Sequence, residues 1–284
     1  MSYFDHVRRR NARDLAGYLP FMIDGDRLGF VTPSRAAILA RYLDVFAVQA
    51  GQIGFASDLI SAEQRTVAMA SIAADLAVSG AFFKIKGEPY AVKNSWHERA
   101  RLQIDRALVP GFGFRAYGVH INGFVHKVSG LHLWIGTRSM TCSVEPSKFE
   151  NMVAGDQPAH LGLIANVVKE CEEEAGIAPD LARTARPVSN LSYSFNAPEG
   201  LKVDTLFCYD LEMPEAIVPA NRDGEISAFR LMPIEEALAL ISSTQAFKFN
   251  VSLVIIDFAI RHGVIDPERE PDYEKIVSGL HGRP

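Results

Sequence analysis

Three glutamates near the middle of the chain carry the clearest chemical signal. Glu170, Glu173 and Glu174 lie within the run from Leu163 to Ala175, which contains neither Pro nor Gly and is predicted to be helical. Their i, i+3, i+4 spacing places them on one arc of that helix. Like charges on one arc repel, and a hard divalent cation reverses the sign of that interaction because Mg²⁺ prefers carboxylate ligands. From the carboxylates alone, an ordinary solvated acidic face is the favoured interpretation, and a metal site is the alternative.

The same helix has an apolar face that would pack on a core. At 100° per residue, the side chains sharing that face are Leu163, Ile164, Val167, Val168 and Cys171. Gly176 follows the last helical residue, in the position of a left-handed C-cap. We therefore expect a helix that ends at Gly176 and presents its glutamates along the flank of a buried stripe.

The string from Gly155 to Ile177 resembles the Nudix box, G-x5-E-x7-R-E-U-x-E-E-x-G-U, where U is a bulky apolar residue. The residues that match in register are Gly155, Glu170, Cys171, Glu173, Glu174, Gly176 and Ile177. Two positions depart from the consensus: Leu161 replaces its first glutamate and Lys169 replaces its arginine. In the family those two residues mainly brace the loop and helix, and Lys169 can still pair with Glu173 at i+4. We expect Leu161 to be partly buried and Lys169 to lie beside Glu173.

The resemblance implies a chemistry for these residues. In the family, acids matching Glu170, Glu173 and Glu174 hold Mg²⁺, with Mn²⁺ as an alternative, and the carbonyl of Ala154 is a further ligand. Hydrolysis of a diphosphate needs an activated water and charge neutralisation on the phosphoryl oxygens. Glu170, Glu173 or a downstream acid would accept the proton of that water.

Four residues outside the box are candidates for substrate binding, and Glu225 is the candidate for the downstream acid. Glu225 is favoured over Glu199 because it precedes a predicted strand, although it also suits a turn after Asp223-Gly224. The substrate candidates are Arg138, Tyr193, Phe195 and His120. Arg138 would clamp a phosphate, or is an exposed arginine at a strand end. The two aromatic residues would stack on an organic ring, or are core residues. His120 would contact substrate, or is a strand residue with a satisfied hydrogen bond.

Composition narrows the classes of partner. The chain has 284 residues, 48% hydrophobic and 22% charged, as in ordinary globular proteins. A net charge of −5 argues against non-specific nucleic-acid binding. Three scattered cysteines, Cys142, Cys171 and Cys208, favour neither a disulfide framework nor a zinc site. No apolar run approaches the ~20 residues that span a bilayer, and the N-terminus lacks the apolar core of a signal peptide, so we expect a cytoplasmic protein without a membrane partner.

The elements that must position the box divide the chain in two. Residues 1–112 are predicted to form a small α+β domain of unknown role, after a short solvated helix at Arg8–Arg13. Within it we expect a hairpin around Gly25, a helix from Thr32-Pro33 with an apolar face running to Phe46, a second helix from the capping box at Ser61 to Gly80, and a hairpin around Lys86-Gly87.

Residues 113–284 are predicted to form the domain that carries the box. A hairpin is expected at Asn122-Gly123, the strongest short hairpin signal in the chain. Further strands are expected at 131–135, 151–154, 188–195, 203–211 and 227–231, with helices at 233–240 and 250–261. Strands that bracket helices suggest a mixed sheet between helices. The fold class is therefore α+β, and the Nudix resemblance implies an α/β/α sandwich around a mixed sheet.

The resemblance extends beyond the box to one branch of the family. Five segments look like the Nudix branch fused to or related to thiamine pyrophosphokinases, which carries its own N-terminal domain: 111–123, 151–155, 169–177, 204–207 and 222–233. This branch implies a Mg²⁺-dependent hydrolase that cleaves thiamine diphosphate or its oxidised analogues to the monophosphate and phosphate. The alternatives are a hydrolase of a nucleoside diphosphate derivative such as ADP-ribose, a non-catalytic ligand-binding or regulatory protein on the same scaffold, and, ranked low, an isomerase of isopentenyl-type diphosphates. The predicted partner is a small-molecule diphosphate, and a homodimer is left open.

Overall fold

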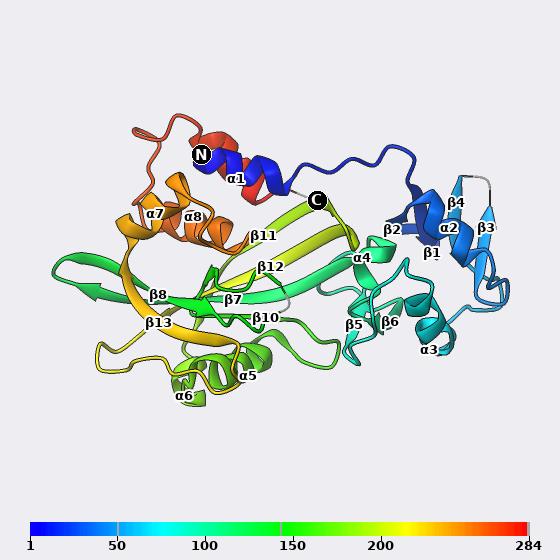
Figure 1. The fold of residues 1–284 in the computed structure, drawn as a ribbon, viewed down its shortest axis with the longest axis horizontal. Coiled ribbons are helices and arrows are strands. Elements are labelled where there is room, and N and C mark those ends of the chain that lie inside the picture. Colours follow the sequence, from blue (N-terminus) through cyan, green and yellow to red (C-terminus); the bar gives the residue numbers. More distant parts are fainter. Residues whose placement is uncertain (50, 143, 283–284) are drawn as a thin grey trace.

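A mixed seven-stranded sheet carries the C-terminal part of the chain in the computed structural model, which describes residues 1–49, 51–142 and 144–282 (Figure 1). Five strands form its path in the order β11-β12-β7-β8-β13, while β10 pairs with β7 and β9 with β8. β12 and β7 are parallel, and the other pairs are antiparallel. The strands are β7 (Arg115–Lys127), β8 (Gly130–Arg138), β9 (Phe149–Glu150), β10 (Val153–Asp156), β11 (Arg186–Ala197), β12 (Gly200–Glu212) and β13 (Ile226–Pro233).

The hairpin predicted at Asn122-Gly123 is wrong. β7 continues through both residues, and the chain turns at 128–129 instead, where the pair Lys127↔Gly130 closes the hairpin of β7 and β8. A Cβ at position 123 would lie 2.1 Å from Met152 Sδ, so this glycine allows close packing rather than a turn. The local turn preference yields to the burial of a long central strand.

Helices cover both faces of this sheet, which gives the predicted α/β/α sandwich (Figure 1). Below the sheet in Figure 1 lie α5 (Leu163–Ala175) and α6 (Pro179–Ala182), whose core includes Val167, Cys171, Val119 and Ile121. Above it lie α7 (Ile234–Ser243), α8 (Val251–Arg261) and α9 (Tyr273–Leu280). Alternate side chains of β7 and β12 therefore enter different cores, as strand geometry requires.

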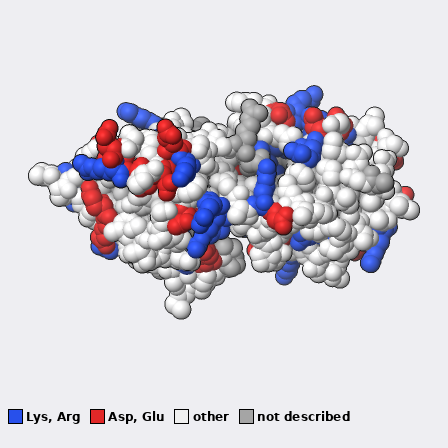
Figure 2. All heavy atoms as spheres, turned by 90° about the horizontal axis from the view of Figure 1, so that it is seen from above, with Lys and Arg blue, Asp and Glu red and all other residues white. Residues whose placement is uncertain are grey.

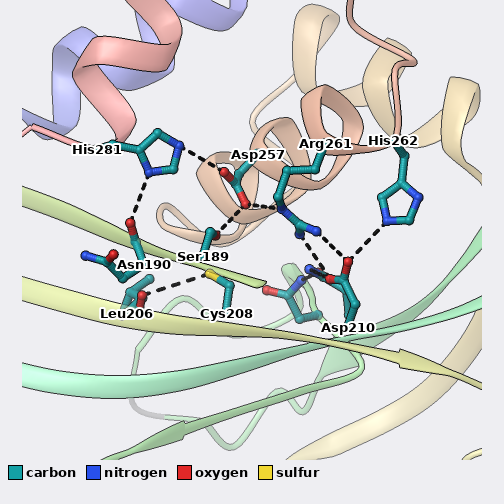
Figure 3. Close-up of polar contacts among 11 residues, drawn as sticks. Ser189, Asn190, Leu206, Cys208, Asp210, Asp257, Arg261, His262 and His281 are labelled. Atoms are coloured by element: carbon teal, nitrogen blue, oxygen red, sulfur yellow. Dashed lines mark hydrogen bonds and ion pairs between the residues drawn. The ribbon is translucent and has the colours of Figure 1, made fainter. Parts of the chain in front are cut away.

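A polar network fastens α8 and the chain after α9 to the sheet (Figure 3). Arg261 of α8 donates to Asp210 of β12 through both terminal nitrogens, at 2.5 and 3.0 Å, and its Nε donates to Asp257 at 2.8 Å. His281 Nε2 lies 3.2 Å from the other oxygen of Asp257. Both aspartates are buried, so the arginine compensates two charges that would otherwise be costly.

A second unit with its own core precedes the sheet. We call residues 19–114 the N-terminal unit, because its buried residues, from Phe21 to Phe114, form one cluster. Its four-stranded sheet has the order β2-β1-β4-β3, and its two-stranded sheet pairs β5 with β6. The elements are β1 (Leu19–Ile23), β2 (Asp26–Val31), α2 (Pro33–Leu39), β3 (Phe46–Gln49), β4 (Gln52–Phe55), α3 (Ala62–Val78), β5 (Pro89–Val92), β6 (Leu102–Asp105) and α4 (Val109–Phe112).

Several local predictions for this unit are confirmed and two are wrong. The hairpin around Gly25 is present, and α3 begins with the full capping box of Ser61. The helix from Pro33 stops at Leu39, so Phe46 lies in a strand. The hairpin around Lys86-Gly87 is absent from the described residues, because β5 pairs with β6 across an intervening loop.

The first helix does not belong to the N-terminal unit, which differs from the predicted division at residue 112. α1 (Tyr3–Arg10) packs beside α8 and α9 (Figure 1), and Val7 is part of the core above the large sheet. A Cβ at Gly279 of α9 would lie 2.4 Å from Val7 Cγ1, so the two helices are in close contact. The chain therefore starts on the C-terminal core and crosses to the N-terminal unit.

The surface and the thiols have ordinary properties. Acidic and basic side chains are interspersed on the face seen from above in Figure 2. Cys142, Cys171 and Cys208 are free thiols. Within the part of the chain that the structure describes, no helix has the length and apolar character needed to cross a membrane.

Candidate active site

The box helix α5 has the bounds predicted for it. It spans Leu163–Ala175, and Gly176 ends it with φ +62° in the left-handed region. Val167 and Cys171 are buried as expected, whereas Ile164 is 46% exposed and does not join the core. The helix lies on β10, which sets the direction of its glutamates.

Glu174 points from α5 into the edge of the sheet. Its side chain is almost fully buried, and its Oε2 accepts a hydrogen bond of 2.9 Å from the backbone N–H of Ala154. Burial, together with the nearby charges of Glu150 and Glu170, raises the pKa of Glu174 well above its usual value. Among the described residues Glu174 has no ion-pair partner, so the fold holds a buried carboxylate without a compensating side-chain cation.

Glu170 lies against the glycine that opens the box. A Cβ at Gly155 would be 2.4 Å from Glu170 Cδ, so only glycine leaves room for this carboxylate beside β10. Lys169 Nζ lies 3.1 Å from Glu170 and 2.7 Å from Glu173. Burial is the main reason that the pKa of Glu170 is raised. Glu173 points outward and is about half exposed.

The two departures from the consensus behave as expected. Lys169 lies beside Glu173, and Leu161 is partly buried in the loop before α5. The loop is held by Gln157, whose side-chain amide donates to the carbonyl of Leu161 at 2.8 Å, and by Asn166, which donates to the carbonyl of Asp156 at 2.9 Å. The side-chain amides of Gln157 and Asn166 thus hold the loop that the consensus glutamate and arginine are expected to brace in other members of the family.

The residues of this edge suit a hard divalent cation. Over the described ranges no three His, Cys, Asp or Glu side chains converge as a preformed metal cluster. The donors are nevertheless carboxylates, the oxygen ligands that Mg²⁺ takes, and Glu174 is a buried carboxyl group without a side-chain cation beside it. A cation held by Glu170, Glu173, Glu174 and the carbonyl of Ala154 would stabilise the ionised form of Glu174.

Glu225 and Glu199 occupy different surroundings. Glu225 precedes β13, its side chain is exposed, and its charge contributes to the raised pKa of Glu174. Its carbonyl accepts from the backbone N–H of Ser139 at 2.8 Å. The carbonyl of Glu199 accepts from Arg35 of the N-terminal unit at 2.8 Å, in the turn between β11 and β12. Glu225 is thus the predicted acid that lies within electrostatic range of the box.

Arg138 is buried rather than exposed at a strand end. Its Nη1 donates to Glu150, and its Nε donates to the carbonyl of Val144 at 3.1 Å. Lys248 also pairs with Glu150. Burial alone would raise the pKa of Glu150, but the two cations hold it below its usual value. Arg138 is therefore paired with Glu150, and the charge of Glu150 helps to raise the pKa of Glu174.

The other three substrate candidates meet at the start of α8. Asn250 Nδ2 lies 3.4 Å from His120 Nε2 and 3.4 Å from the Tyr193 hydroxyl. Phe195 packs on Phe249 with ring centroids 5.6 Å apart. Tyr193 is only 1% exposed, so in this structure its ring is part of the core.

His120 is satisfied within the protein. Its Nδ1 lies 2.8 Å from the side-chain oxygen of Asn151, and burial lowers the pKa of His120 to about 4. It is therefore neutral near pH 7. The structure brings His120, Tyr193 and Phe195 together on the face of the sheet that α8 covers. They do not lie beside the glutamates of α5, which covers the other face.

The comparisons with known proteins agree with this arrangement. Nudix hydrolase 24, chloroplastic, of Arabidopsis thaliana is 39% identical over 266 residues, which is 93% of this chain and 73% of that protein. The chain belongs to the Nudix hydrolase family. Nudix hydrolase 20, chloroplastic, of the same plant is 38% identical over 279 residues, 94% of this chain and 74% of that protein.

Two further matches concern parts of the chain. Residues 2–116 match the family described as Domain of unknown function (DUF4743). The crystal structure of DR0079 from Deinococcus radiodurans matches with a TM-score of 0.45 and 22% identity, covering 60% of this chain and 98% of that one.

Membership has consequences for two predictions. This Nudix hydrolase is an enzyme that acts on phosphoric anhydride bonds, as predicted. The cytoplasmic location predicted for it is wrong, because both plant relatives carry names that place them in chloroplasts. The absence of an apolar N-terminal segment does not test for plastid targeting, since transit peptides are amphipathic and rich in Ser and Arg.

Sequence reasoning missed one residue of this region of the Nudix hydrolase. Glu150 has no motif around it, and only the folded sheet places it between Arg138 and Lys248. For Arg106 the sequence left two interpretations, an arginine that could reach a phosphate and the favoured one, an ordinary surface residue. In the structure its Nη1 lies 2.8 Å from Asp156 of the box.

Proposed function

We propose that this Nudix hydrolase cleaves the diphosphate of thiamine diphosphate and of its oxidised analogues with Mg²⁺. Water and the diphosphate would give the monophosphate and orthophosphate, so that one phosphoric anhydride bond breaks and one P–O bond to water forms. The observation that carries the diphosphate chemistry is Glu174, a buried carboxylate hydrogen-bonded to the backbone of Ala154 beside Glu170. The thiamine-type ring rests on the resemblance of five segments to the branch related to thiamine pyrophosphokinases.

Each residue of the box would have a separate role in metal binding or proton transfer. Glu170, Glu173, Glu174 and the carbonyl of Ala154 would hold Mg²⁺. When bound, this ion neutralises phosphoryl oxygens and lowers the pKa of a water molecule. Glu170, Glu173 or Glu225 would accept the proton of the attacking water. Lys169 would compensate the charges of Glu170 and Glu173, because its Nζ contacts both carboxylates.

The second cluster would support the site from the other side of the sheet, because it lies on the face covered by α8, away from the glutamates of α5. Phe195 is half-buried beneath the guanidinium of Arg10, 5.0 Å from its ring centroid, and packs with Tyr193 on that face. His120 would hold β7 in place opposite Ala154, its cross-strand partner. Arg138 would act by positioning, because Glu150 already engages its guanidinium.

A panel of diphosphates tests the proposal. Purified enzyme with Mg²⁺ is given thiamine diphosphate, its oxidised analogues, ADP-ribose and a dinucleotide, and phosphate and monophosphate release are measured. We expect turnover of the thiamine compounds, faster for the oxidised ones. Turnover of ADP-ribose alone would keep the hydrolase and discard the thiamine-type ring. Tight binding of a diphosphate without turnover of any compound would instead favour a non-catalytic binding protein.

A further inference from the structure

One arginine of the N-terminal unit reaches the Nudix box. Arg106 follows β6, and its backbone N–H is held by the carbonyl of Glu88 at 2.9 Å. Its side chain crosses to β10, where Nη1 lies 2.8 Å from Asp156 Oδ2, and the same nitrogen lies 2.9 Å from Glu88 Oε2. The backbone N–H of Ala159 in the box loop donates to the carbonyl of Pro89 in β5 at 2.9 Å. The N-terminal unit therefore contacts the box loop at a second point.

Asp156 ties Arg106 to the glutamates of the box. Asp156 follows Gly155, where an added Cβ would lie 2.4 Å from Glu170 Cδ. The charges of Asp156 and Glu170 are close enough that Asp156 helps to raise the pKa of Glu170. Glu88 is likewise close enough to feel the charge of Lys169. The carboxylates in this connected group outnumber its cations, which are Arg106 and Lys169.

The guanidinium of Arg106 is only partly used. Both carboxylates contact Nη1, and neither Nε nor Nη2 has a hydrogen bond to any residue in the described ranges. The side chain is 37% exposed. The hydroxyl of Tyr90 is buried close to both Arg106 and Asp156, but it makes no hydrogen bond of ordinary geometry with any described residue. The Nε–Nη2 edge of Arg106 and the Tyr90 hydroxyl therefore have unused donors beside the box.

A structural arginine in the same unit looks different. Arg65 is 6% exposed, and all three of its nitrogens donate: Nε to Leu59, Nη1 to Asp24, and Nη2 to Asp24 and Ile60. An arginine that serves only to hold segments together thus has every edge satisfied. Arg106 instead keeps open the Nε–Nη2 edge that binds phosphate oxygens in a bidentate way.

We infer that the N-terminal unit completes the active site, and that Arg106 binds a phosphate group of the organic diphosphate through Nε and Nη2. This inference rests on the proposed diphosphate hydrolysis at the box. Lys169 is committed to Glu170 and Glu173, so Arg106 is the cation of this group with donors to spare. Glu88 and Asp156 hold Nη1 and so fix the direction of the fork, while the Tyr90 hydroxyl can donate to the same phosphate.

The test compares Arg106→Gln and Arg106→Lys with Arg41→Gln, which removes the same charge from an exposed position of the same unit. With Mg²⁺ present, kcat/KM for thiamine diphosphate, inhibition by inorganic pyrophosphate and Tm are measured for each variant. Arg106→Gln should lower kcat/KM and weaken pyrophosphate inhibition by about 10- to 150-fold, as expected for a hydrogen bond to a charged group. Arg106→Lys should recover only part, because an ammonium lacks the bidentate edge. Arg41→Gln should resemble wild type.

A fourth variant separates substrate binding from a purely structural contact. Asp156→Asn removes one of the two ion pairs at Nη1 and leaves the other, with Glu88, so the free edge of Arg106 is kept and pyrophosphate inhibition should persist. If Arg106→Gln and Asp156→Asn lose activity and Tm together, or if Arg106→Gln behaves as wild type, the inference is overturned. If wild type cleaves no diphosphate, the proposed function fails, and calorimetric binding of pyrophosphate with Mg²⁺ still decides the role of Arg106: weaker binding to Arg106→Gln than to wild type supports it, and equal or absent binding refutes it.

Discussion

The backbone N–H of Ala154 donates a 2.9 Å hydrogen bond to the buried carboxylate of Glu174. This bond fixes the end of α5 against β10, and it brings the carboxylate next to the residue whose carbonyl the Nudix resemblance names as a ligand. Burying an ionised carboxylate costs free energy unless an opposite charge compensates it. A cation bound beside Glu174 would supply that charge.

The glutamates can be tested one at a time. Glu173→Gln should lower kcat at least ~100-fold, because metal-ion charge stabilisation supplies several kcal/mol of the barrier. Glu174→Gln should do the same and should keep the fold, because burial raises the pKa of Glu174 and so favours the neutral form, which glutamine resembles. Glu172→Gln is the matched control, because Glu172 is exposed on the same helix. Near-wild-type kcat in both test variants would rule out the assignment.

The glycine that opens the box can be tested by sterics alone. Gly155→Ala would put a Cβ 2.4 Å from Glu170 Cδ, so either the carboxylate or β10 must move. Overpacking of this kind costs about 1–3 kcal/mol. We expect a folded enzyme with a lower Tm. If the steric cost is met by displacing the Glu170 carboxylate and so raises the activation barrier, kcat should fall at least ~10-fold. Gly162→Ala, where the added Cβ meets nothing within 4 Å, should leave kcat unchanged. Equal activity of the two variants would contradict the placement of Glu170.

The missing consensus glutamate offers a test of the loop. Leu161 is partly buried, so Leu161→Glu should destabilise the loop and should not raise turnover. The reason is that Gln157 and Asn166 already hold the loop through backbone carbonyls. Thermal unfolding and steady-state kinetics measure both effects. A several-fold gain in kcat would mean that the lost glutamate had a catalytic role.

Patterns of neighbouring residues correctly predicted the features that depend only on local sequence, such as helix bounds and caps. The bounds of α5, its left-handed cap at Gly176 and the capping box of α3 follow from periodicity and cap residues, and all are present. The Asn122-Gly123 signal failed because a buried strand overrides a turn preference when Gly123 must pack on Met152. Contacts such as Arg138–Glu150–Lys248 could not be predicted, because Lys248 lies almost a hundred residues along the chain and meets Glu150 only through the sheet.

The network under α8 predicts a pH dependence of stability. The hydrogen bond to Asp257 raises the pKa of His281 above its ordinary value of 6.5 (Figure 3), although burial opposes it. A raised pKa means that the contribution of charged His281 is complete below about pH 6.5 and is lost as pH rises through the folded-state value. His281→Gln should therefore lower Tm more at about pH 5.5 than at about pH 9.

Two features make that comparison interpretable. Burial alone would raise the pKa of Asp257, but hydrogen bonds from His281, Ser189 and Arg261 keep it below its ordinary value, so it is ionised at both pH values. His97→Gln serves as the control, because His97 is exposed in the N-terminal unit. An effect of His281→Gln that is the same at both pH values would exclude the charged contact.

The most direct measurement follows thiamine diphosphate by ³¹P NMR with the wild-type enzyme, with Mg²⁺ and with the ion removed by EDTA. The proposed function predicts that the two diphosphate signals are replaced by those of orthophosphate and the monophosphate, only when Mg²⁺ is present, and that Glu174→Gln abolishes the change. Undiminished cleavage in EDTA, or no cleavage of any diphosphate with Mg²⁺, would contradict it.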